Sequence, residues 1–91
     1  MSSGPVIIRD PEAVRMFASQ LDQFNNDLAE RSARLDSQFR RLGEVWQDPA
    51  YSKFADEFRQ TMANLRRFRE IAEPVVPSLH ALYERIMSVH R

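Results

Sequence analysis

The chain has 91 residues, enough for one small domain over residues 1–91. Its 13 basic residues balance 13 acidic ones, so it lacks the basic excess typical of nucleic-acid-binding domains, and the absence of cysteine excludes disulfides and thiol chemistry. No apolar run approaches the roughly 18 residues that a membrane-spanning helix needs. We therefore expect no nucleic-acid partner and no membrane span.

The segment before residue 10 does not resemble a Sec-type signal peptide. It has no basic flank, and its only apolar run is Val6-Ile7-Ile8. We expect this run to pack on the end of the helices that follow. The predicted location is the cytoplasm, with secretion by a route other than Sec as the alternative.

A first helix is predicted over about residues 11–45. Asp10 is a favoured N-cap residue, and Pro11 suits the first helical position because no N–H is needed there. The apolar residues that follow recur at steps of three and four, the period of a helix. They are Val14, Phe17, Leu21, Phe24, Leu28, Leu35, Phe39, Leu42 and Trp46, with Arg31 and Gln38 at two positions where an apolar residue is expected.

The polar middle of this helix is expected to be supported by ion pairs between an acid and a base four residues apart. These pairs are Asp27 with Arg31, Glu30 with Arg34 and Asp36 with Arg40.

A second helix is predicted over about residues 49–89, after a turn at 46–49, because Asp48-Pro49 repeats the Asp-Pro start signal. Its apolar stripe again steps by four and three: Phe54, Phe58, Thr61, Leu65, Phe68, Ala72, Val75, Leu79, Leu82, Ile86 and Val89. Pro74 and Pro77 each remove a backbone hydrogen bond, but the stripe stays in phase across them. We expect a kink near 74–77, or a break followed by a restart in register.

The predicted fold is an all-α antiparallel two-helix hairpin in which the two stripes meet. A second apolar column on the second helix, made of Ala55, Met62, Val76 and Tyr83, widens its stripe beyond what one helix can cover. A lone hairpin also has a thin core. We therefore predict that Met62, Val76 and Tyr83 lie on a dimer surface. Two hairpins would then form a four-helix bundle, the second being a copy of this chain or a paralogous protein.

The turn carries the only tryptophan, in the sequence Trp46-Gln47-Asp48-Pro49-Ala50, with Phe54 four residues further on. This stretch resembles the Trp-Xaa-Gly signature of the WXG family, the early-secreted-antigen-like helical hairpin proteins. Trp46, Ala50 and Phe54 fit the signature, whereas Asp48 stands where the family has glycine. Asp48 suits a helix cap, but it would be strained if the turn required a positive φ.

The resemblance implies a non-enzymatic, dimeric component, partner or substrate of a type VII-like secretion system. It also implies a paralogous WXG-like partner and contact with a secretion ATPase, with Trp46, Asp48, Ala50 and Phe54 as the turn motif and partner contact. The family's export signal, Tyr-Xaa-Xaa-Xaa-Asp/Glu, is not matched, because Tyr83 is followed by Met87 at that spacing. Export of this chain alone is therefore not expected. The alternative function is a cytoplasmic helical-bundle adaptor or regulatory subunit unrelated to export.

Trp46 has two interpretations that can hold together. It could close the turn end of the core against Phe39, Leu42 and Phe54. It could also be an aromatic anchor for a partner, as tryptophan often is at interfaces.

No set of residues predicts catalysis, a cofactor or a metal site. His80 and Glu84 lie four residues apart and could contact one ion, but a site needs three or four ligands, and His90 lies on the wrong turn to complete it.

A basic cluster of Arg59, Arg66, Arg67 and Arg69 lies on the second helix. This cluster could contact phosphate or an acidic partner. We expect instead that Arg66 and Arg67 lie near Asp27 and Glu30 of the first helix, since the neutral composition argues against a nucleic-acid-binding face.

Overall fold

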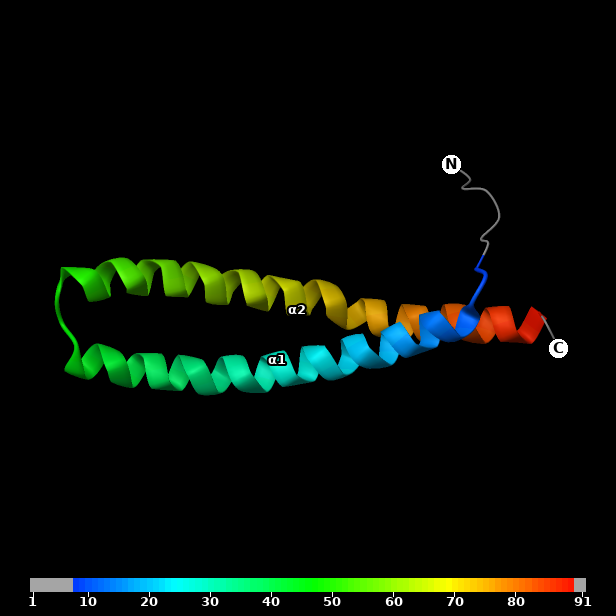
Figure 1. Ribbon diagram of the computed structural model, residues 1–91, viewed down its shortest axis with the longest axis horizontal. Helices are drawn as coiled ribbons and strands as arrows, with labels where there is room; N and C mark the ends of the chain where they lie inside the picture. Colours follow the sequence, from blue (N-terminus) through cyan, green and yellow to red (C-terminus); the bar gives the residue numbers. More distant parts are fainter. Residues whose placement is uncertain (1–7, 90–91) are drawn as a thin grey trace, which may run out of the picture.

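The computed structural model describes residues 8–89, which form two long helices side by side, joined by a short turn (Figure 1). α1 is Pro11–Val45 and α2 is Pro49–Val89. The molecule measures 63 × 28 × 17 Å, and α2 alone accounts for the long dimension, since a helix rises about 1.5 Å per residue. The predicted all-α hairpin is confirmed. The predicted dimer involves a second chain and stays a prediction, and most of the Val6–Ile8 run lies outside the described residues.

The two Asp-Pro pairs precede the two helices, but they act differently. The Asp48 carboxylate caps α2 by accepting a hydrogen bond from the Tyr51 N–H at 3.0 Å. Asp10 occupies the N-cap position of α1, yet its side chain makes no capping bond. Its backbone carbonyl accepts a bond from the Ala13 N–H at 3.1 Å instead. The start of α1 was therefore predicted correctly, and its side-chain cap was not.

α2 continues as one helix through Pro74 and Pro77. Because proline has no N–H, the carbonyls of Glu70 and Glu73 lose their donors within the helix. The Ser78 hydroxyl donates to the Pro74 carbonyl at 2.9 Å, a local bond of the kind that often bends helices. The helix nevertheless continues through both prolines without a break.

The core between the helices is small. Among residues 8–89, the buried apolar side chains are Ala18, Phe39, Ala55 and Ala72, with exposed fractions of 0%, 9%, 2% and 4%. Phe39 is the one large member, and its ring stacks on that of Phe58 with 4.2 Å between centroids. The core is thus aromatic near the turn and small elsewhere.

On α1, the residues that pack on α2 lie mostly in a column next to the predicted apolar stripe. Phe17, Phe24 and Leu35 are 58%, 54% and 50% exposed, so they are not buried between the helices. The column of Ala18, Asn25, Ser32 and Phe39 is more buried on α1. Asn25 reaches α2 directly, since its Nδ2 donates to the Arg69 carbonyl at 3.3 Å. Of the predicted α1 stripe, Phe39 is therefore buried against α2, whereas Phe17, Phe24 and Leu35 are not.

Candidate functional site

The turn is organised by the Asp48 carboxylate. α1 ends at Val45, and its C-cap residue is Trp46, whose backbone N–H donates to the Leu42 carbonyl at 2.9 Å. The Trp46 indole Nε1–H donates to Asp48 Oδ2 at 2.7 Å, while Asp48 Oδ1 accepts the Tyr51 N–H. One side chain therefore ties the end of α1 to the start of α2.

The same contacts favour the charged form of this carboxylate. The indole bond from Trp46, followed by the backbone bond from Tyr51, lowers the pKa of Asp48 below its ordinary value of 3.8. None of the non-glycine residues described has a positive φ. Aspartate therefore replaces the glycine of the Trp-Xaa-Gly signature without backbone strain, and it adds a negative charge at the N-terminus of α2, where the helix dipole favours one.

Tyr51 is a contact of the turn that the sequence did not predict. Its ring packs edge-on against Trp46 with 5.4 Å between centroids, and it also stacks at 6.0 Å on Phe39. The Tyr51 hydroxyl passes so close to Gly43 that a Cβ built there would lie 2.5 Å from it. The sequence feature that could have indicated this contact is Gly43, one turn before Trp46, because a glycine leaves room for the close approach of another side chain. Of the remaining motif residues, Ala50 is exposed and Phe54 is 46% exposed beside Phe39.

An open groove between the helices begins next to the turn. Its lining is apolar except for one glutamine: Leu35, Gln38, Phe39, Leu42, Phe54 and Phe58. Exposed apolar side chains continue along this side of the hairpin, where Phe24 and Phe68 meet edge to face with 5.9 Å between centroids. We call this surface the apolar face and define it as Phe17, Phe24, Leu35, Phe54, Phe68 and Val75, each between 37% and 58% exposed.

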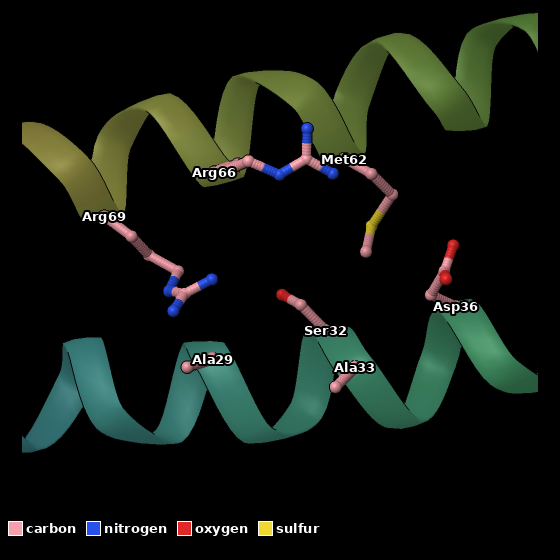
Figure 2. A pocket seen from close by; sticks show the side chains of 7 residues that line it. All are labelled: Ala29, Ser32, Ala33, Asp36, Met62, Arg66 and Arg69. Atoms are coloured by element: carbon pink, nitrogen blue, oxygen red, sulfur yellow. The ribbon is translucent and has the colours of Figure 1, made fainter.

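A second cleft between the helices is polar, and Figure 2 shows how its side chains lie. Ala29, Ser32 and Ala33 leave room on α1, and the side chains of Arg66 and Arg69 lie opposite them on α2. The predicted proximity of Arg66 and Arg67 to Asp27 and Glu30 is not accompanied, among the described residues, by ion pairs between the helices. All ion pairs found within residues 8–89 join residues of one helix, and Glu30 pairs with Arg34.

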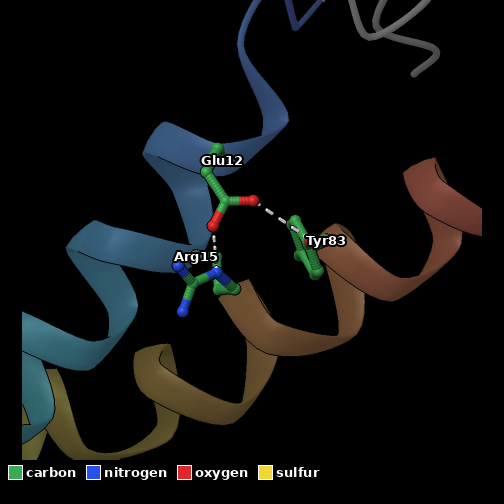
Figure 3. A network of polar contacts seen from close by, with 3 residues as sticks. All are labelled: Glu12, Arg15 and Tyr83. Atoms are coloured by element: carbon green, nitrogen blue, oxygen red, sulfur yellow. Dashed lines mark hydrogen bonds and ion pairs between the residues drawn. The ribbon is translucent and has the colours of Figure 1, made fainter.

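The open end of the hairpin is joined by Tyr83 and Glu12 (Figure 3). The Tyr83 hydroxyl donates to Glu12 Oε2 at 3.3 Å, and the other carboxylate oxygen of Glu12 pairs with Arg15. Burial, followed by the charge of Glu12, raises the pKa of the Tyr83 hydroxyl above its ordinary value of 10.0. Tyr83 is therefore engaged by α1.

The predicted dimer residues all lie at the boundary of the hairpin contact. Met62 lines the polar cleft against α1, Tyr83 contacts Glu12, and Val76, between them in the same column, is half-buried. Their contact with a second chain stays a prediction. Ala55, the first member of the column, is 2% exposed within this hairpin, so it is not accessible to a second chain.

The described residues hold no group of three or more histidine, aspartate or glutamate side chains arranged to bind a metal ion. Neither α1 nor α2 contains a segment apolar and long enough to cross a membrane.

The geometry defines a class of protein: a helical hairpin that presents an exposed apolar face and a tryptophan-aspartate turn. The family model WXG100, described as proteins of 100 residues with WXG, matches residues 7–85. The chain therefore belongs to the WXG100 family, the secreted helical-hairpin proteins of type VII secretion systems. No curated protein and no solved structure matches the chain.

Membership also settles the broad class of activity. WXG100 proteins are non-enzymatic, they typically form heterodimers, and type VII systems secrete them. The prediction that this chain is not an enzyme is thereby confirmed.

Proposed function

We propose that this chain is a dimerising component of a type VII-like secretion system, whose apolar face packs on a second hairpin to form a four-helix bundle. The observation that carries the proposal is the exposure of the apolar face. Phe17 and Phe24 leave more than half of their surface in water, although buried aromatic side chains are a large source of stability. Contiguous apolar patches of this kind mark interaction sites on small proteins.

The shape of the surface favours a helical partner. The groove beside Phe54 is shallow and open, and the exposed rings repeat along both helices at helical spacing. A helix laid along such a groove places its own apolar residues at matching intervals. A small ligand would instead need an enclosed pocket that buries most of its surface.

Two further contacts belong to the proposal. Trp46 and Phe54, in the turn motif that Asp48 and Ala50 complete, would contact the partner or a secretion ATPase at the turn end. Met62, Val76 and Tyr83 would contribute at the edge of the dimer interface. Trp46 and Tyr83 are of the residue types that are enriched in interface hot spots.

A matched pair of variants tests the apolar face. Phe17 and Met16 are neighbours in α1 with exposed fractions of 58% and 57%, but side chains of adjacent helical residues point about 100° apart. We expect Phe17→Ser to reduce capture of the partner hairpin from the native host by about tenfold or more. Met16→Ser should leave capture unchanged, because Met16 lies off the face.

Pull-down of the tagged chain from its native host, followed by light scattering on the product, provides the measurement. Recovery of a hairpin partner that the two variants hold equally well would argue against the apolar face as the interface. Recovery of no helical partner, together with a single-chain mass, would argue against the dimer itself.

A further inference from the structure

The apolar face has a charged residue near its centre. Arg31 follows Phe24 by seven residues and is exposed in the same column of α1, within one turn of the midpoint of that helix. Leu28 and Leu35 lie three residues before it and four residues after it, so apolar side chains flank it along the helix. A partner hairpin that covers Phe24 and Leu35 must therefore also cover Arg31.

The guanidinium of Arg31 is not neutralised within the hairpin. Two of the three pairs predicted for this part of α1 do form: Arg34 with Glu30 at 2.7 Å and Arg40 with Asp36 at 2.8 Å. Within residues 8–89, no ion pair joins Arg31 to Asp27 or to any other carboxylate. Covering an unpaired charge with apolar surface is costly, so the partner must supply the missing carboxylate.

Symmetry bears on whether a second copy can be this partner. Dimers of identical chains are two-fold symmetric, so each residue meets the same kind of surface on both chains. A residue near the middle of an elongated hairpin faces the middle of its copy, whether the two turns lie together or at opposite ends. Self-pairing through the apolar face would therefore bring two Arg31 guanidinium groups into one zone of the interface, and like charges placed together at an interface oppose association.

We propose that Arg31 selects the partner: the apolar face is covered by a different helical hairpin that carries an aspartate or glutamate near the middle of its own apolar stripe. The inference rests on the proposed dimer and adds to it the chemistry of the partner. The arginine excludes a second copy of this chain and fixes the alignment of the correct partner, because the charge pair forms in one register.

Charge-swapped copies of the chain provide the probe. We expect the wild-type chain to self-associate about 100-fold more weakly than Arg31→Leu, which completes the apolar stripe, the ratio expected when an interface carries an unpaired charge. Arg31→Glu alone should also self-associate weakly. A mixture of wild type and Arg31→Glu should form a one-to-one complex more tightly than either chain pairs with itself, and added salt should weaken that preference. Analytical ultracentrifugation over a concentration series measures all four.

Arg40→Leu and Arg40→Glu are the matched controls. Arg40 lies in the same helix and its side chain is 78% exposed, but it pairs with Asp36, which lines the polar cleft on the other side of the hairpin. Both controls should associate like the wild type, and circular dichroism should report equal helix content for every variant.

The outcomes separate this inference from the proposed function. Self-association of the wild type as tight as that of Arg31→Leu would overturn the selection by Arg31, with a second copy as the occupant, while leaving the apolar face as a dimer surface. Failure of both Arg31→Leu and the mixture of wild type with Arg31→Glu to associate at any concentration would also overturn the selection by Arg31, whereas the apolar face itself is tested separately by capture of the host partner with Phe17→Ser.

Discussion

At the scale of single residues, Asp48 connects the two helices through one carboxylate. Asp48→Ala removes both the bond to the Tyr51 N–H and the bond from the Trp46 indole. We expect the melting temperature to fall by about 4–8 °C, the shift that loss of a typical helix cap produces in a domain of this size. Asp48→Asn should fall less, because its amide oxygen can still accept the Tyr51 N–H. Thermal melts by circular dichroism measure both, and affinity for the partner hairpin should be unchanged in the folded protein.

The lowered pKa of Asp48 predicts how stability depends on pH. Its folded-state pKa lies below the ordinary value of 3.8, so the folded state favours the charged form. The carboxylate therefore contributes stability above pH 3.8 that is lost as the pH falls through the folded pKa. We expect the difference in unfolding free energy between the wild type and Asp48→Asn to shrink as the pH is lowered through this range. A difference that stays constant in acid would contradict the assigned contacts.

Trp46 is predicted to have a role that can be separated from that of Asp48. Its ring is half-buried against Tyr51, which leaves part of the indole accessible at the end of the hairpin. We expect Trp46→Ala to weaken binding of the partner hairpin by about 2 kcal/mol or more, the hot-spot scale, measured by calorimetry on the folded protein. If Trp46 served only the core, the unfolding free energy from denaturant melts would fall instead by about 3–5 kcal/mol, the cost of deleting a large buried aromatic side chain. The folded fraction would then bind the partner normally.

At the scale of helices, Gly43 and Tyr51 must be considered together. Gly43→Ala would raise helix propensity by about 0.8–1.0 kcal/mol, but the new methyl group would meet the Tyr51 hydroxyl. We expect Gly43→Ala to lower the melting temperature, because the ring must shift away from Phe39 and Trp46. In the Tyr51→Phe background the hydroxyl is gone, so the same substitution should raise it. Equal effects of Gly43→Ala in the two backgrounds would show that the close contact carries no cost.

The positions of the helices could be predicted from the sequence, but the side by which they pack could not. The Asp-Pro pairs and the three-four periodicity are local signals. The choice of contact column depends on the fit between helices, and both flanks of each stripe contain apolar residues. The structure places small residues such as Ala18 and Ala55 where the helices approach, and leaves bulky Phe17 and Phe24 outside. Hydrophobicity alone could not identify the contact column, because it contains the polar residue Asn25.

The candidate site was likewise predictable where it is local. The Asp48 cap follows from residue type and the following proline, and the indole of Trp46 needs a hydrogen-bond partner when partly buried. The Tyr51 contact with Gly43 crosses the turn, and the Tyr83 bond to Glu12 spans 71 residues of sequence. Such contacts depend on the register of the hairpin, which no short motif encodes.

At the scale of the whole molecule, the hairpin brings its open end together at Tyr83, and this bears on export. In the family's export signal, a tyrosine is followed by an acid four residues later. Here position 87 is a half-exposed methionine, and the carboxylate that Tyr83 contacts belongs to Glu12 of α1. We expect the chain expressed without its partner in a host with a type VII system to stay inside the cells, because the residue four positions after Tyr83 is not an acid.

Met87→Glu should restore the spacing and send the chain into the culture medium. Ser88→Glu is the matched control, since it adds the same charge to the same exposed turn at a spacing of five. Immunoblots of medium and cell fractions, with a cytoplasmic marker for lysis, measure the difference. Wild-type chain in the medium without a partner would contradict the requirement for an acid at position 87. Export of both variants would show that added negative charge at the C-terminal end of α2 causes export, whatever its spacing from Tyr83.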